Sequence, residues 1–118
     1  MSSAKQTRGQ WGEDTVCNYL LQHEYSIDAR NWHCRYGEID IVARKSGVLV
    51  FVEVKLRGSR AMVSGLESVT PSKQIKLRRA AECYLQKLGS DVPARFDVIE
   101  LVADGSNVKG IEWVKNAF

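Results

Sequence analysis

The most regular hydrophobic stretch of the chain covers residues 48–56 and reads VLVFVEVKL. Its apolar residues fall on both alternating faces, which is typical of a strand inside a sheet that is covered on both sides. Glu53 and Lys55 interrupt this pattern near its end, on the face that they share with Phe51. Because charged groups are costly to desolvate, both need a partner, a cation or access to solvent. We therefore expect a central strand with functional chemistry at its end.

Two other segments have apolar residues at helical spacing. In residues 8–24 the apolar stripe consists of Trp11, Val16, Cys17, Leu20 and Leu21. In residues 71–88 the predicted buried side consists of Ile75, Leu77, Ala80, Ala81, Tyr84, Leu85 and Leu88. Thr70 and Pro71 are typical of the start of this second helix, and Gly89 is typical of its end.

Each predicted helix carries a charged residue close to its apolar side. At about 100° per residue, Glu13 points with the stripe of the first helix. An acid in a first turn can also simply interact with the helix dipole, so position alone does not give Glu13 a function. Lys73 lies at the edge of the apolar side of the second helix.

Four further strands are predicted at residues 25–34, 37–43, 94–102 and 108–114. The element order is then α-β-β-β-α-β-β, which indicates an α/β fold with a mixed central β-sheet flanked by helices. A chain of 118 residues is expected to form a single domain. Residues 1–7 are expected to be a flexible tail, and residues 57–69, which show no clear period, a mobile loop.

The turn at Ser46 and Gly47 predicts how the second and third strands pair. A two-residue or four-residue loop pairs residues whose numbers add to 93, and this register puts Asp40 opposite Glu53. Their Cβ atoms would then be about 4.5–5.5 Å apart. A three-residue loop would instead turn Asp40 to the valine face, where it has no partner. Because opposed like charges are destabilising, the even register predicts a cation between the two acids.

Composition places the chain among soluble globular proteins, with 44% hydrophobic and 26% charged residues. No apolar run approaches the roughly 20 residues of a membrane span. The N-terminus lacks the apolar region of a signal peptide, and three scattered cysteines suit reduced thiols, so a cytoplasmic location is expected. The net charge of +3 favours anionic partners only weakly, but residues 70–88 contain five basic residues and one acid.

A Glu-x-Lys triplet is a weak signal on its own, and its simplest explanation is a salt bridge and a charge at a strand end. Its context is more informative, because the motifs around it resemble a known family. They are Gly12-Glu13, Gly37-Glu38-Ile39-Asp40, Phe51-Val52-Glu53-Val54-Lys55, a lysine in the following helix, and Arg95-Phe96-Asp97-Val98. This order resembles the YraN-like family, a bacterial branch of the PD-(D/E)XK nuclease superfamily related to archaeal Holliday-junction resolvases.

The resemblance implies a restriction-endonuclease-like core and a role for each motif residue. Asp40 and Glu53 would be the metal-binding acids, joined by the Val54 carbonyl, and Lys55 would be the motif lysine. Glu13 would be the helix acid that supports a second metal or the ligands of the first. Lys73, with Gln74, would correspond to the helical position that contacts the scissile phosphate.

We therefore expect a metal-dependent DNA endonuclease that uses Mg²⁺ or Mn²⁺ and selects DNA structure rather than sequence. Flanking phosphates would be held by Arg57, Arg60, Lys76, Arg78 and Arg79, although a solvated helix face explains any one of these equally well. If the substrate is a four-way junction, a homodimer follows because two strands must be cut. Two alternatives stay open, namely a nucleic-acid-binding protein with an inactive site and a metal hydrolase that is not a nuclease.

Overall fold

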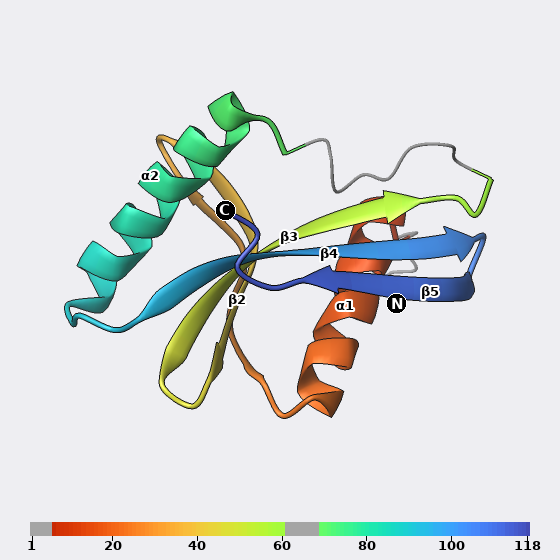
Figure 1. The fold of residues 1–118 in the computed structure, drawn as a ribbon, viewed down its shortest axis with the longest axis horizontal. Helices are drawn as coiled ribbons and strands as arrows, with labels where there is room; N and C mark the ends of the chain where they lie inside the picture. The colour runs from red at the N-terminus through yellow and green to blue at the C-terminus, as the bar shows by residue number, and fades with distance from the viewer. Residues whose placement is uncertain (1–5, 61–68) are drawn as a thin grey trace, which may run out of the picture.

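The computed structural model describes residues 6–60 and 69–118 of the chain (Figure 1). These residues form two helices and five strands, in the predicted order: α1 (Arg8–Gln22), β1 (Ser26–Cys34), β2 (Gly37–Lys45), β3 (Val48–Arg57), α2 (Pro71–Leu88), β4 (Ala94–Asp104) and β5 (Asn107–Val114). Residues 1–5 of the expected tail and residues 61–68 of the expected loop lie outside the described residues. Neither described helix is long and apolar enough to cross a membrane.

The five strands form one mixed sheet in the order β1-β2-β3-β4-β5. Strands β3 and β4 are parallel and are connected through α2, whereas the other neighbouring strands are antiparallel. Figure 1 shows α1 and α2 on opposite sides of the sheet, with β3 in its middle. The α/β fold and the central position of β3 are therefore as predicted.

The two faces of β3 belong to two separate hydrophobic clusters. Val50 and Val52 pack in a cluster with Val16 and Leu20 of α1. The opposite face of β3 packs against α2 through a second cluster, which contains Leu49, Phe51, Ala80 and Ala81. A strand buried in this way must be apolar on both sides, which explains the sequence of residues 48–52.

Both helices begin where the sequence predicts, because a threonine caps each of them. The Thr7 hydroxyl accepts a hydrogen bond from the Gln10 backbone N–H, and the Thr70 hydroxyl accepts one from that of Lys73. Gly89 ends α2 with a positive φ of 74°, a conformation that favours glycine.

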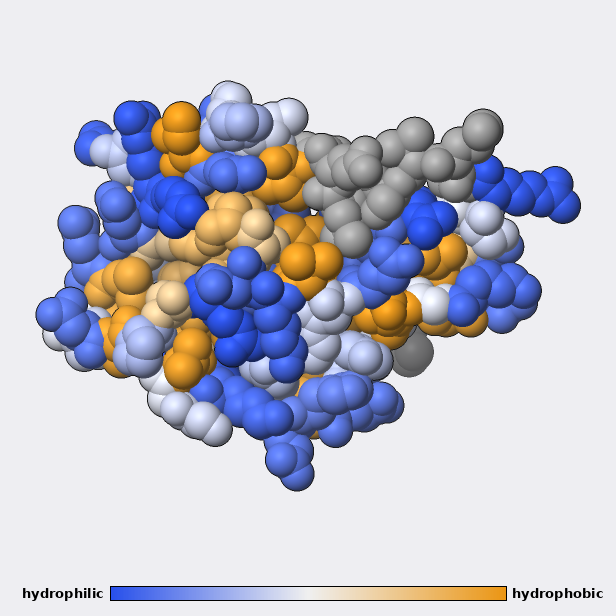
Figure 2. All heavy atoms as spheres, in the orientation of Figure 1, coloured by the Kyte–Doolittle hydropathy of each residue, from blue (hydrophilic) through white to orange (hydrophobic). Residues whose placement is uncertain are grey.

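Three residues predicted on the buried sides of the helices are in fact exposed. Leu21 is 53% exposed, Ile75 54% and Leu88 37%. The buried residues of α2 are only Leu77, Ala80 and Ala81, so a narrow, small-residue face meets the sheet. In Figure 2 the α2 side of the molecule is mostly hydrophilic, with separate hydrophobic patches between the polar residues.

The register of the β2–β3 hairpin is the predicted one. The ladder runs from the pair Lys45–Val48 to the pair Ile41–Val52, and the two residue numbers of each pair add to 93. The turn residues Ser46 and Gly47 both have positive φ, of 52° and 79°, as in the tight turns that suit two-residue hairpins.

The buried carboxylate of Asp97 connects the motif Arg95-Phe96-Asp97-Val98 to the C-terminal segment. The fully buried Asp97 accepts hydrogen bonds from Trp113 Nε1 at 2.8 Å and from the Asn116 backbone N–H at 2.9 Å. Arg95 Nε lies 3.0 Å from Asp97 Oδ1 and balances its charge. This motif therefore has a structural role in the described part of the chain.

Candidate functional site

Three of the predicted catalytic residues, Asp40, Glu53 and Lys73, border a cavity of about 240 Å³ between the sheet and α2, whereas Glu13 and Lys55 do not line it. Asp40 comes from the start of β2, Glu53 from β3 and Lys73 from the first turn of α2. The lining is completed by Gly37, Glu38, Lys76 and Leu77. Residues more than thirty positions apart in the sequence are thus brought to one place by the hairpin and by the packing of α2.

Asp40 lies between two isoleucines of β2 that pack on opposite faces of the sheet, although the pairing of β1 with β2 keeps one register across it. On either side of it, Arg30 pairs with Ile41 and Trp32 pairs with Ile39. Asn31, which lies between Arg30 and Trp32 on β1, has a positive φ of 49°. As a result, Ile39 packs in the α2-side cluster although Ile41 packs in the α1-side cluster. The backbone at Asp40 therefore departs from simple alternation between the two faces of the sheet.

The Asp40 side chain is fixed by the backbone of β3. Its Oδ2 accepts a hydrogen bond of 2.9 Å from the Val54 N–H, just beyond the last ladder pair, Ile41 with Val52. Glu53 is the next residue after this pair, so the two carboxylates lie beside each other where the hairpin pairing ends. The Val54 backbone is held against Asp40 by the same bond.

Two lysines surround the Glu53 carboxylate. Lys55 Nζ and Lys73 Nζ each lie 3.7 Å from Glu53 Oε1. The side chains of Glu53 and Lys55 are only 12% and 15% exposed, whereas that of Lys73 is 43% exposed. Lys73 is therefore the group of this trio that can most readily reach a ligand from solvent.

Burial and crowding of charges shift the proton affinities of these groups. Burial raises the pKa of Glu53, and the neighbouring Asp40 raises it further, against the effect of the two lysines. Burial also raises the pKa of Asp40, in part offset by its hydrogen bond from Val54. Burial lowers the pKa of Lys55, and Lys73 beside it adds to this effect, whereas the contact with Lys55 raises the pKa of Lys73. Negative charge on the acids is thus costly in this cavity.

Glu13 approaches the site from α1, with the inward orientation that the sequence predicts. Its Oε1 is buried and has no hydrogen-bond partner within residues 6–60 and 69–118. Burial raises the pKa of Glu13, the charge of Asp40 raises it further, and a hydrogen bond with Asn31 lowers it. Glu13 therefore feels the charge of Asp40 but does not line the cavity.

These oxygen donors fit a hard divalent cation. Mg²⁺ and Mn²⁺ prefer carboxylate and carbonyl oxygens, and one or two protein carboxylates with additional waters are enough for Mg²⁺. Asp40 and Glu53 provide such a pair, and the Val54 backbone is held against Asp40 by the hydrogen bond from its N–H. In the described part of the chain, no three His, Cys, Asp or Glu side chains meet at a point suited to a metal. A cation here would therefore rely on the acid pair, backbone oxygen and water.

The other residues that are predicted to contact phosphates do not all lie at this cavity. Lys76 lines the same cavity as Lys73, whereas Arg79 lines a second cavity further along α2. The amide of Gln74 donates to the Val69 carbonyl at 3.1 Å. Arg60 is exposed at the edge of the described residues.

Two of the predicted arginines have partners within the protein. Arg57 Nε lies 2.7 Å from the buried Glu100 Oε1, and its Nη2 lies 3.8 Å from Glu112. Arg78 lies over the ring of Phe96, 5.3 Å from its centre, and close to Phe118. Their role as phosphate contacts stays a prediction.

Sequence reasoning missed two residues of the site. Glu38 lines the cavity, and its charge contributes to the raised pKa of Asp40. The signal was available, because Glu38 is two residues before Asp40 on a strand. Asn31 orients Glu13, and an asparagine inside an otherwise regular strand is itself a sign of a left-handed position.

Comparison with known proteins places the chain in a family. The model of the uncharacterised protein family UPF0102 matches residues 12–101, a range that contains Glu13, Asp40, Glu53, Lys55 and Lys73. The chain belongs to the family UPF0102. This is the YraN-like family that the sequence motifs resemble.

The match extends over whole chains of other members. A UPF0102 protein of Dichelobacter nodosus is 44% identical over 98% of this chain and 94% of its own. One from Nitrosomonas eutropha is 39% identical over 100% and 97%. A third, from Neisseria meningitidis, is 40% identical over 92% of each chain. The family description assigns no activity, so function must be argued from the site.

Proposed function

We propose that this UPF0102 protein is a metal-dependent endonuclease that hydrolyses phosphodiester bonds in DNA, as its resemblance to PD-(D/E)XK nucleases implies. The observation that carries the proposal is that Asp40, Glu53 and Lys73 line one cavity, with Lys55 Nζ 3.7 Å from Glu53 Oε1. We further propose that it selects branched or junction DNA and acts in DNA repair or recombination. A four-way junction would require a homodimer, with one site for each strand.

The chemistry of phosphodiester hydrolysis suits this set of side chains. Asp40, Glu53 and the Val54 carbonyl would hold Mg²⁺ or Mn²⁺, which when bound supplies the positive charge that stabilises negative charge developing on the phosphate. A cation also relieves the repulsion between the two buried acids. A bound cation would therefore also stabilise the fold around these two carboxylates.

The two lysines can have different roles in the hydrolysis. Lys55 is buried beside Glu53 and has a lowered pKa, so it can orient a water molecule and accept a proton from it. Lys73 keeps its proton and is more exposed, so it can bind a non-bridging phosphate oxygen. One group thus acts on the nucleophile and the other on the phosphate.

A specific observation also supports a second candidate, a DNA-binding protein that does not cleave. Glu53 is within 3.7 Å of both lysines, so much of its charge is balanced by the protein itself. Such a site would bind DNA through Lys73 and Lys76 without needing a metal. The two candidates differ in whether the DNA is cleaved when a divalent cation is added.

The test incubates labelled four-way junction, flap, single-stranded and linear duplex DNA with the protein and Mg²⁺, Mn²⁺ or EDTA. Cleavage that needs a cation, and that is lost in Glu53→Gln, is the expected result. Lys55→Ala should slow cleavage by about 10²–10⁴-fold, the usual contribution of a group that transfers a proton. The matched controls are Glu24→Gln and Lys109→Ala, which change exposed charges that do not line the cavity. Binding of DNA with no cleavage under any cation would favour the second candidate instead.

A further inference from the structure

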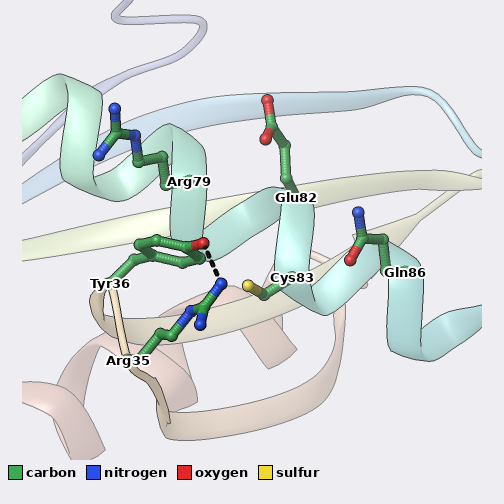
Figure 3. A pocket seen from close by; sticks show the side chains of 6 residues that line it. All are labelled: Arg35, Tyr36, Arg79, Glu82, Cys83 and Gln86. Atoms are coloured by element: carbon green, nitrogen blue, oxygen red, sulfur yellow. Dashed lines mark hydrogen bonds between the residues drawn. The ribbon is translucent and has the colours of Figure 1, made fainter.

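A second and larger cavity lies between α2 and the turn that joins β1 to β2. Its volume is about 500 Å³. It is lined by Arg35, Tyr36, Arg79, Glu82, Cys83 and Gln86 (Figure 3). It contains none of the acids or lysines of the candidate site, and the proposed hydrolysis gives it no role.

The two cavities are neighbours along the same two elements. On the turn, Tyr36 lines the second cavity and the next residue, Gly37, lines the first. On α2, Lys76 lines the first cavity, and Arg79, three residues later, lines the second. From Lys73 to Arg79 the rise along the helix axis is about 9 Å. A DNA strand with a phosphate at Lys73 that runs along α2 would therefore bring a neighbouring nucleotide close to the second cavity.

One wall of the second cavity is an aromatic ring between two guanidinium groups. Arg35 lies 4.9 Å from the centre of the Tyr36 ring and donates a hydrogen bond of 2.7 Å to its hydroxyl. Arg79 lies 5.9 Å from the centre of the ring. Figure 3 shows Arg35 and Arg79 on opposite sides of Tyr36. Arg35 thus supports one face, and the face toward Arg79 is only loosely covered.

A planar base would fit between Tyr36 and Arg79 once Arg79, now 5.9 Å from the ring centre, moves outward. With about 3.5 Å per stacked layer, a base between them needs about 7 Å, which the long and exposed Arg79 side chain can provide by a small movement. Aromatic faces and guanidinium planes are the surfaces on which unpaired bases stack in nucleic-acid-binding proteins. The carboxylate of Glu82 and the amide of Gln86, one helical turn apart, offer hydrogen bonds to the edge of a base.

We propose that the second cavity binds one unpaired base of the DNA strand whose phosphate lies at Lys73, an inference that rests on the proposed function. A base inside a duplex is stacked on its neighbours and cannot enter. The subsite therefore makes the enzyme prefer DNA that has an unpaired nucleotide beside the cleaved bond, as in a flap or an open junction.

The test compares DNA affinity in EDTA, so that it does not depend on cleavage. The two probes are a linear duplex and the same duplex with a single-stranded flap. The parent should bind the flap more tightly, and Tyr36→Leu should reduce this preference by about 5- to 150-fold, the usual range for one stacked base. Tyr36→Phe keeps the ring and should retain the preference. Arg78→Ala, which removes a charge from the adjacent position on α2, should lower affinity for both probes equally.

A second measurement locates the base directly. A flap that carries 5-iodouracil at successive positions is irradiated with the protein, and the crosslinked peptide is identified by mass spectrometry. Crosslinks at Tyr36 from a position next to the cleaved bond support the subsite. Equal flap preference in the parent and in Tyr36→Leu, with no crosslink at Tyr36, overturns it even if the parent cleaves DNA. If the parent binds and crosslinks through Tyr36 without cleavage, the subsite stands and the nuclease proposal fails.

Discussion

The Asp40 carboxylate accepts a hydrogen bond from the Val54 N–H at 2.9 Å, although the last ladder pair, Ile41 with Val52, lies one residue from Asp40 and two from Val54. A side chain thus takes over the place of a ladder bond where β2 and β3 separate. The bond directs Asp40 toward the strand that carries Glu53 and Lys55. It also couples the shape of the site to the hairpin register, because a slip of one residue would remove both the bond and the acid pair.

The first prediction concerns metal binding without reference to activity. Mn²⁺ or Mg²⁺ should raise the melting temperature of the parent, because a ligand that binds only the folded state stabilises it. The rise should be absent in Glu53→Gln and in Asp40→Asn, and differential scanning fluorimetry measures it. Glu112→Gln, an exposed acid on β5, is the control and should respond like the parent. An equal shift in all four proteins would mean that the cation binds elsewhere.

A second prediction follows from the raised pKa of Glu53 in the metal-free protein. The folded state holds this proton more tightly than the unfolded state does, so its contribution to stability is present at low pH. That contribution is lost as pH rises through the raised pKa of the folded state. Glu53→Gln cannot lose a proton there, so its stability relative to the parent should increase with pH. Urea unfolding in EDTA across the acidic and neutral range tests this, and a difference that does not change with pH would contradict the raised pKa.

The third prediction separates Lys76 from exposed lysines elsewhere. If Lys76 contacts a phosphate, Lys76→Ala should reduce the salt dependence of DNA affinity by about one unit of the logarithmic slope. Lys109→Ala, on the exposed edge strand β5, should leave the slope unchanged. Fluorescence anisotropy at several salt concentrations gives both slopes. Identical slopes for parent and Lys76→Ala would place the DNA away from this cavity.

A fourth prediction concerns stability alone. Asp97→Ala should lower the free energy of unfolding by about 3–5 kcal/mol, because it removes a fully buried carboxylate and leaves the half-buried Arg95 and Trp113 groups without their shared partner. Trp113→Phe removes only one hydrogen bond to this carboxylate and should cost about 1–3 kcal/mol. Denaturant titration measures both. A smaller loss for Asp97→Ala than for Trp113→Phe would contradict the central position of Asp97 in this network.

The hairpin and its acid pair could be predicted because they depend on local rules. Alternation on β3 and the turn at Ser46 and Gly47 are sufficient to fix the register, and the register brings Asp40 to Glu53. The end of α2 could also be predicted from local sequence, because Gly89 takes the left-handed conformation that its position requires.

Other features depend on packing that no local pattern contains. The exposure of Ile75 follows from the narrow face with which α2 meets the sheet, and the 3.7 Å distance from Lys73 to Glu53 follows from the same contact. The left-handed Asn31 and the change of face at Asp40 depend on both strands of the β1–β2 pair. The cavity around Tyr36 requires the turn and α2 together, so it was not predicted at all.

The central claim is that Asp40 and Glu53 together hold one divalent cation. The most direct measurement is the anomalous difference map of a crystal of the parent protein soaked in Mn²⁺, with a soaked Glu53→Gln crystal as control. The account predicts a peak in the cavity within bonding distance of one oxygen of each acid, and no peak in the variant. A fully soaked parent crystal with no peak there, or with Lys73 still between the acids and the manganese, would contradict it.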